Sequence, residues 1–394
     1  MLSRLYAQWM LHWETALTTR DTNRLVRPLE FGFDWLGLPE PADPADNLSA
    51  LVAANRDLLA HSDGFFGYTT PADFRLETRH PALFPTNVRP ETLAQHADLQ
   101  HRASIGELEE GQFLRFTSPV RTPFPENDLV NARWYPAHPS TQRGKPRQAI
   151  VVMPQWNADA FSHNALCTFF NTLGISALRL SKPYHDIRRP AELERSDFAV
   201  SSNLGRTIHA CQQAVVDIRS CLDWLELGGY TQFGVLGTSL GSAYAFIAAA
   251  HDPRLEVCCF NHASRQFGDV IWTGQSTRHI RAAVEAAGLS QSDLRDALAV
   301  LSPANYMQRF ATNSPRRRTC VIHATWDLTF LEEFSQEVLA DFRRLGIPHT
   351  ARTLPCGHYT TGEFPYKYLD GFYIGHFIHK AFHDLAQQPA ATPA

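Results

Sequence analysis

Ser239 stands between two glycines in the stretch Gly237-Thr238-Ser239-Leu240-Gly241, a G-x-S-x-G pattern. An apolar run precedes this stretch and an alanine-rich run follows it, so the serine is expected on a sharp turn from a strand into a helix. Such a turn needs small neighbours, and it lifts the hydroxyl above the sheet. The Leu240 amide, at the start of the helix, would then point at any negative charge that forms nearby. The pattern predicts a nucleophile, and the alternative interpretation is a serine that only caps the helix.

The elements around this turn repeat in a regular order. Five short apolar runs are typical of buried strands, and the segments between them carry apolar residues at steps of three and four, the spacing of one helical face. Strands that are apolar throughout and separated by amphipathic helices indicate a parallel sheet covered on both faces, which is an α/β fold. The expected strands are 149–153, 176–180, 233–237, 256–260 and 320–324.

The connection between the fourth and fifth of these strands, about residues 261–319, is too long for a simple crossover. It contains two helical patterns, which predict a helical cap above the carboxyl ends of the strands, where open α/β sheets bind ligands. Residues 121–394 are assigned to one α/β domain, and residues 1–120 to an N-terminal extension of unknown role. That extension is expected to begin with an amphipathic helix, and two strands, at 111–120 and 127–137, are expected to open the sheet.

With its glycines, strand and helix, the Ser239 turn resembles the nucleophile elbow of the α/β-hydrolase superfamily, in its esterase and lipase-like branch. The resemblance covers about residue 121 to the end of the sequence. It implies the α/β-hydrolase fold and catalytic residues in the chain order serine, acid, histidine. Asp327 follows the strand at 320–324, and His358 follows an expected last strand. The resemblance therefore implies that His358 removes the proton of Ser239 and that Asp327 orients His358.

Alternative interpretations stay open for these positions. Asp327 could instead cap the helix that follows it, and His358 could be a surface loop histidine, one of eighteen histidines in the chain. Asp269 could supply the acid if the triad uses the earlier strand. His323, inside the strand before Asp327, is expected to be a packed core residue.

The resemblance also implies a second oxyanion donor besides the Leu240 amide, in the loop after the strand at 149–153. Lipases of the superfamily often have His-Gly or His-Gly-Gly-Gly in this loop, whereas this chain has Pro-Gln-Trp-Asn-Ala-Asp. The backbone amide of Gln155 or Trp156 is therefore the candidate donor. The Trp156 ring is either a wall of the pocket or a core aromatic.

Two polar clusters are weaker candidates for substrate binding. Tyr184 and His185 follow the strand at 176–180, at the carboxyl edge of the sheet, where they either contact substrate or anchor the loop by hydrogen bonds. Arg278, in the predicted cap, could bind an acidic group of a substrate, although a solvated charge is the commoner outcome for such a residue.

Composition narrows the possible partners. Thirty-six basic and 40 acidic residues give a formal charge of −4, which argues against nucleic acid or an anionic membrane as the main partner. Seven cysteines without paired spacings predict reduced core residues. Metal, phosphate-loop and dinucleotide motifs are absent from the sequence, so neither a cofactor nor a metal is expected. No apolar run approaches the ~18 residues of a membrane span. The expected compartment is the cytoplasm, and a homo-oligomer stays open.

The resemblance implies a serine hydrolase that acts on a small-molecule acyl substrate through an acyl-enzyme intermediate, and a carboxylic ester is the expected bond because esters are the common substrates of the superfamily. Thioesterase, acyltransferase and peptidase activities use the same three residues and stay alternatives. From a different class, the fold could serve as a binding or scaffold module without catalysis. That interpretation needs a missing triad member, and all three are present in the chain.

Overall fold

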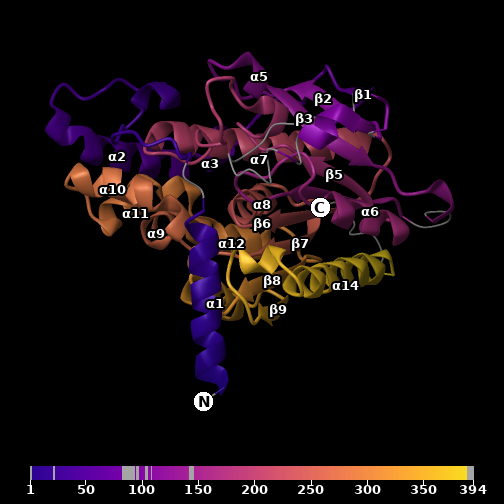
Figure 1. Ribbon diagram of the computed structural model, residues 1–394. Helices are drawn as coiled ribbons and strands as arrows, with labels where there is room; N and C mark the ends of the chain where they lie inside the picture. The colour runs from indigo at the N-terminus through magenta and orange to yellow at the C-terminus, as the bar shows by residue number, and fades with distance from the viewer. Residues whose placement is uncertain are drawn as a thin grey trace.

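The computed structural model describes residues 2–20, 23–81, 94, 97–102, 105–107, 109–141 and 146–387. Within these residues one sheet of nine strands runs through the molecule, in the order β1-β2-β3-β5-β4-β6-β7-β8-β9 (Figure 1). The pairings between β1, β2, β3 and β5 are antiparallel, and those from β5 onward to β9 are parallel. The strands are β1 Arg75–Arg79, β2 Gly111–Thr117, β3 Leu129–Tyr135, β4 Gln148–Met153, β5 Ser176–Leu180, β6 Gln232–Thr238, β7 Leu255–Asn261, β8 Arg318–Ala324 and β9 His349–Leu354.

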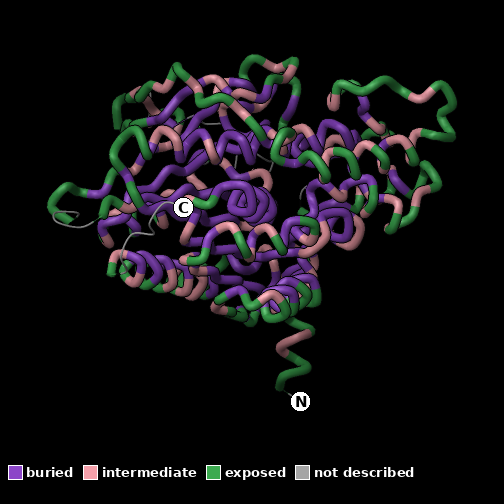
Figure 2. The backbone as a smooth tube through the Cα atoms, turned by 180° about the vertical axis from the view of Figure 1, so that it is seen from behind, coloured by how far each residue is buried: buried purple, intermediate pink, exposed green. Residues whose placement is uncertain are grey.

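Helices cover both faces of this sheet, as the apolar strands predict. Successive residues of β4 point to opposite sides, so Val151 belongs to one apolar core, whereas Ile150 and Val152 belong to the other. Figure 2 shows that the buried backbone is concentrated in the sheet and the inner helix α8. The α-helices are α1 Leu2–Thr18, α2 Asn47–Ala60, α3 Ser62–Phe65, α5 Pro125–Asp128, α6 Asn164–Thr172, α7 Leu204–Leu227, α8 Leu240–His251, α9 Phe267–Thr273, α10 Arg278–Ala286, α11 Gln291–Ala297, α12 Met307–Thr312, α13 Glu332–Arg344 and α14 Tyr366–Ala386.

The long connection between β7 and β8 is helical and contains α9, α10, α11 and α12. It packs against α2 of the N-terminal extension (Figure 1). The Asn55 side chain, fully buried in this contact, donates to the Ala297 carbonyl (2.9 Å) and accepts from the Val300 amide (3.1 Å). Because a buried amide left without partners is costly, this pair of bonds ties the two segments together.

The N-terminal extension contributes to the sheet as well. β1 and β2 precede residue 121 and form the edge of the sheet next to β3. The amphipathic helix expected at the N-terminus is α1, whose first turns project from the body of the molecule (Figures 1 and 2). Its later turns are packed, with Met10, Glu14, Leu17 and Thr18 buried. The domain division at residue 120 stays a prediction.

The seven cysteines are all free and buried, which confirms that they are core residues. In the described part of the chain, no helix is both long enough and apolar enough to cross a membrane.

Candidate active site

The turn at Ser239 joins β6 directly to α8, with a backbone φ of 55° and ψ of −120° at the serine. Positive φ is rare for a residue other than glycine and is strained there. A Cβ atom on Gly237 would lie 2.3 Å from the Gly241 carbonyl oxygen, and one on Gly241 would lie 2.2 Å from the Met153 carbonyl oxygen. The Ser239 side chain makes no capping hydrogen bond to α8. The helix-cap interpretation of this serine is therefore wrong, and the hydroxyl is left for another role.

Asp327 and His358 come together at the carboxyl ends of β8 and β9. The Asp327 Oδ2 atom lies 2.8 Å from His358 Nδ1. Asp327 Oδ1 accepts the amides of Thr329 (2.7 Å) and Phe330 (2.6 Å), and the Phe330 ring stacks on the imidazole at 5.4 Å between centroids. Because α13 begins only at Glu332, Asp327 is not the cap of that helix. Asp327 Oδ1 therefore stabilises the turn that follows Asp327, and Asp327 Oδ2 binds His358.

The charges at this pair are set by burial and by each other. Burial alone would raise the pKa of Asp327, but the neighbouring imidazoles hold it well below its usual value. Burial alone would lower the pKa of His358, but Asp327 and, more weakly, Glu14 raise it above its usual value. The pair therefore combines an ionised carboxylate with an imidazole that has an increased affinity for a proton.

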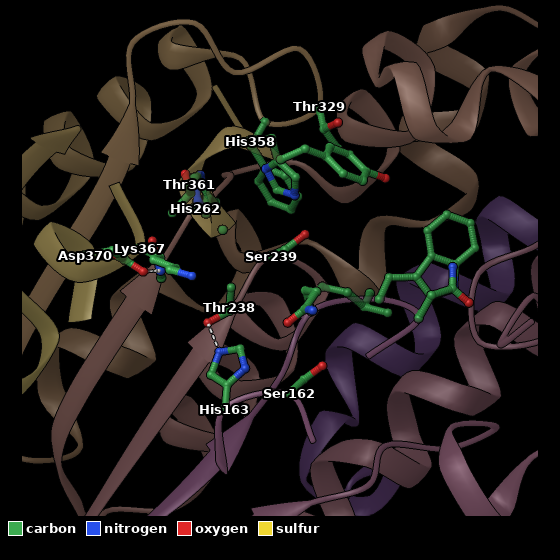
Figure 3. Close-up of a pocket in the computed structure, with 18 of the residues that line it drawn as sticks. Ser162, His163, Thr238, Ser239, His262, Thr329, His358, Thr361, Lys367 and Asp370 are labelled. Atoms are coloured by element: carbon green, nitrogen blue, oxygen red, sulfur yellow. Dashed lines mark hydrogen bonds between the residues drawn. The ribbon is translucent and has the colours of Figure 1, made fainter. Parts of the chain in front are cut away.

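Ser239 and His358 line one cavity of about 1080 Å³ (Figure 3). No hydrogen bond joins these two described side chains. Catalytic hydrogen bonds are often long or poorly aligned before substrate binds. Apolar side chains from α6, the β7–β8 insertion and α14 form much of the wall, among them Leu166, Phe169, Phe267, Ile271, Phe372 and Ile374.

Gln155, Trp156 and Leu240 also line this cavity. In the described structure their backbone amides donate to no protein acceptor, so they are available to a ligand. Trp156 both lines the pocket and packs against the apolar core, and its Nε1 donates to the Ser196 carbonyl (3.0 Å). The buried Lys182 Nζ donates to the Gln155 carbonyl (2.8 Å) and so anchors this loop.

His185 and Tyr184 do not lie where they could contact a substrate in the cavity. His185 is buried; its Nδ1 contacts the Pro183 carbonyl (2.8 Å) and its Nε2 accepts the Asn157 amide (3.1 Å). Burial lowers the pKa of His185 well below its usual value, which matches a neutral ring with one donor and one acceptor nitrogen. Tyr184 is buried between the Phe124 and Phe198 rings. Neither lines the cavity, and His185 instead supports the loop that carries Gln155 and Trp156.

The remaining candidates lie away from the cavity. Arg278 is exposed on α10 and does not line it. Asp269 is paired with Arg295 (2.9 Å) and is not joined to His358. His323 is buried in β8, as predicted for a core residue.

His262, which the sequence reasoning missed, contacts the Asp327–His358 pair. Its Nδ1 lies 2.9 Å from Asp327 Oδ2, and its ring centroid lies 4.6 Å from that of His358. Burial, aided by His358, lowers the pKa of His262. The available signal was its position one residue after β7, at the same edge of the sheet.

A second polar group lies beside the serine turn. The Asn261 Nδ2 donates to Asp370 Oδ2 (2.9 Å), and the Asn261 carbonyl accepts the Ser239 amide (2.8 Å). Burial raises the pKa of Asp370 to about 7. His163 Nε2 contacts Thr238 Oγ1 (2.9 Å), as Figure 3 shows. These residues give the cavity a polar region next to Ser239.

His262, Asp327 and His358 form the one described group of potential ligands close enough for a metal ion, with ligand atoms within 4.8 Å of one another. Both imidazole Nδ1 atoms lie within 3 Å of Asp327 Oδ2, but only His358 forms a hydrogen bond with it, whereas His262 Nδ1 lies close without hydrogen-bond geometry. We assign no metal to this group.

The sheet, the serine turn and the order of the three residues define the chain as an α/β hydrolase. The family described as alpha/beta hydrolase domain containing 18 matches residues 89–326, more than half of the chain, and the chain belongs to this family. The matched region includes Ser239 and ends one residue before Asp327. No curated protein sequence matches the chain.

Solved structures share the fold at low sequence identity. The acylaminoacyl peptidase of Pyrococcus horikoshii is similar with a TM-score of 0.55 and 12% identity, over 74% of this chain but only 45% of the peptidase. The acetyl xylan esterase of Paenibacillus sp. R4 is similar with a TM-score of 0.53 and 12% identity, over 86% of this chain and 96% of the esterase. Acetyl xylan esterase 1 of Thermoanaerobacterium sp. JW/SL YS485 gives a TM-score of 0.51 and 12% identity, over 87% and 95%.

Proposed function

We propose that this protein is a serine hydrolase that cleaves carboxylic esters, with Ser239 as nucleophile, His358 as general base and Asp327 as the acid that orients His358. The observation that carries the proposal is the 2.8 Å contact between Asp327 Oδ2 and His358 Nδ1 at the wall of a cavity that Ser239 also lines. Because Nδ1 faces the carboxylate, Nε2 is the nitrogen left for the serine proton.

The reaction follows from this arrangement. Ser239 Oγ attacks the ester carbonyl carbon while His358 Nε2 removes its proton. The imidazolium then donates that proton to the leaving alkoxide oxygen as the C–O bond breaks, which leaves an acyl group on Ser239. Water attacks the acyl-enzyme with His358 again acting as base, and the carboxylic acid leaves as the serine proton returns. Asp327 stays ionised throughout, since its pKa lies well below its usual value.

The negative charge of the tetrahedral intermediate needs donors. The Leu240 amide at the start of α8 and an amide of Gln155 or Trp156 are the proposed oxyanion hole, because they border the cavity beside Ser239 and donate to no protein acceptor in the described structure. Buried Lys182 and His185 hold the loop of Gln155 and Trp156 in position before substrate binds. This reduces the reorganisation needed when negative charge develops in the transition state.

The substrate is proposed to be a small-molecule ester whose acyl part enters the apolar side of the cavity. The acetyl xylan esterases with the same fold are esterases by name, which is compatible with this activity. The peptidase with the same fold keeps amide cleavage as the alternative, so a panel of matched esters, thioesters and amides is the direct comparison. The ester of each matched set is expected to be cleaved fastest, and an added alcohol acceptor separates acyl transfer from hydrolysis.

A fluorophosphonate probe tests the nucleophile. We expect labelling at Ser239, located by mass spectrometry, and loss of both labelling and turnover in Ser239→Ala with the fold retained. Ser162→Ala is the matched control, because Ser162 lines the same cavity but contacts Asp159 (2.9 Å) rather than His358. An unlabelled wild-type protein that cleaves no ester would favour a non-catalytic binding module.

A further inference from the structure

We propose that the N-terminal helix α1 belongs to the catalytic apparatus, with Glu14 as a positioning residue that holds the loop carrying His358. The inference rests on the proposed function, since it assumes that His358 is the general base. It also assigns a role to a part of the N-terminal extension, whose sequence contains no recognisable catalytic motif.

Glu14 binds the backbone on the C-terminal side of His358. Its side chain is fully buried, and its Oε1 accepts the Tyr359 amide (2.8 Å). Its Oε2 accepts the Thr360 amide (3.1 Å) and the Thr360 hydroxyl (3.2 Å). Three donors of this loop therefore bind the Glu14 carboxylate, which lies on a helix 345 residues away in the chain. Charge-assisted bonds of this kind are among the stronger ones in proteins, so the loop is held firmly.

Gly357 makes this approach possible on the N-terminal side of His358. A Cβ atom at Gly357 would lie 2.4 Å from Glu14 Oε2, so any larger residue would displace the carboxylate. The Gly357 amide donates to Thr360 Oγ1 (2.6 Å), which in turn donates to Glu14. Both residues adjacent to His358 in the chain therefore accommodate Glu14: Gly357 leaves room for the carboxylate, and the Tyr359 amide donates to it.

Helix α1 also contacts the loop that carries Asp327. The Tyr6 ring packs edge-on against Trp326, the residue before Asp327, at 5.1 Å between centroids. The Tyr6 hydroxyl donates to the Pro355 carbonyl in the loop after β9. The Trp326 amide donates to the Cys356 carbonyl (2.9 Å), which joins the two loops to each other. One helix thus contacts the segments that carry both the acid and the base.

Glu14 acts on His358 electrostatically as well. The charged or titratable groups around the imidazole are Asp327, His262 and Glu14, with the Tyr359 ring at 5.6 Å. After Asp327, Glu14 contributes the other negative charge that raises the pKa of His358. Burial raises the pKa of Glu14 itself, and the Tyr359 amide opposes that shift. A negative charge here favours the imidazolium that forms during acyl transfer.

The test compares Glu14→Gln and Glu14→Ala with wild type in the full chain, by steady-state ester kinetics and by the pH profile of kcat/KM. We expect Glu14→Ala to lower kcat by about 10- to 100-fold with little change in KM, because Glu14 does not line the cavity. Glu14→Gln keeps the size and removes the charge. Its acidic limb is expected to move to lower pH, because His358 loses one anionic neighbour. Glu40→Gln, an exposed carboxylate, is the control.

The outcomes separate this inference from the proposed function. If the wild type cleaves no ester and Ser239 takes no fluorophosphonate, the proposed function fails. If the wild type is active and Glu14→Gln matches it in kcat and in its pH limb, Glu14 does not position His358 and the inference is overturned. A lower kcat with an unmoved pH limb, accompanied by a lower melting temperature, would also overturn it, because α1 would then act only on stability.

Discussion

His262 and His358 lie against the same oxygen of Asp327. Their Nδ1 atoms are 2.9 Å and 2.8 Å from Oδ2, and their rings are 4.6 Å apart at an angle of 56°. A carboxylate buried in this way depends on its partners, because an unpaired buried charge is costly. The His262 imidazole therefore helps to keep Asp327 ionised and correctly positioned for His358.

Replacing His262 with alanine is expected to lower kcat/KM by about 10-fold, since Asp327 loses one of its two imidazole partners. Ester kinetics and thermal unfolding of the variant measure the two effects separately. His61→Ala is the matched control, because its imidazole pairs with Asp57 at an exposed site. Wild-type kcat/KM in His262→Ala would show that the second histidine only fills space.

In the proposed mechanism, the pH dependence of kcat/KM follows from the protonation of His358. The base must be neutral to take the serine proton, and its pKa in the free enzyme lies above the ordinary value of about 6.5. Activity is therefore expected to fall as the pH decreases, with a midpoint above pH 6.5, and to be retained at higher pH until other groups titrate. A neutral ester substrate and circular dichroism at each pH separate this limb from substrate titration and unfolding. A midpoint below pH 6 would contradict the assigned surroundings of His358.

Glycine 241 is expected to tolerate no side chain. In Gly241→Ala the new Cβ would meet the Met153 carbonyl at 2.2 Å, so the serine turn must move. We expect a loss of about 3 kcal/mol in unfolding free energy, measured with urea, and loss of fluorophosphonate labelling. Gly371→Ala is the control: it lies within α14 with open space around its Cβ, and alanine there is expected to stabilise the helix by about 0.5–1 kcal/mol. Equal stabilities of the two variants would disprove the close packing at the elbow.

The sequence pattern was sufficient where the structure depends on neighbouring residues. Gly237 and Gly241 flank Ser239 in one turn, so the elbow was predicted with its reason, and the apolar runs predicted the parallel strands. Asp327 and His358 were chosen from chain order, and the structure brings them within hydrogen-bonding distance.

Side-chain direction was less predictable from sequence. His185 was placed correctly at the carboxyl edge of the sheet, but the positive φ values of Tyr184 (64°) and Asp186 (52°) turn its loop back on itself. The imidazole consequently faces Asn157 and the protein interior rather than the cavity. The spacing of apolar residues in the sequence does not predict such turns at residues other than glycine, because contacts with distant residues sustain the backbone strain of these turns.

The sequence by itself determined the class of fold, the serine turn and the order of the three candidate catalytic residues, because each of these depends on residues that are adjacent or regularly spaced in the chain. Only the tertiary structure decided which side chains surround them. Glu14 meets Tyr359 and His262 meets Asp327 because strand order and helix docking bring separate segments to one edge of the sheet. Contacts between segments so far apart in the chain are created by packing of the whole core, and no local pattern specifies them.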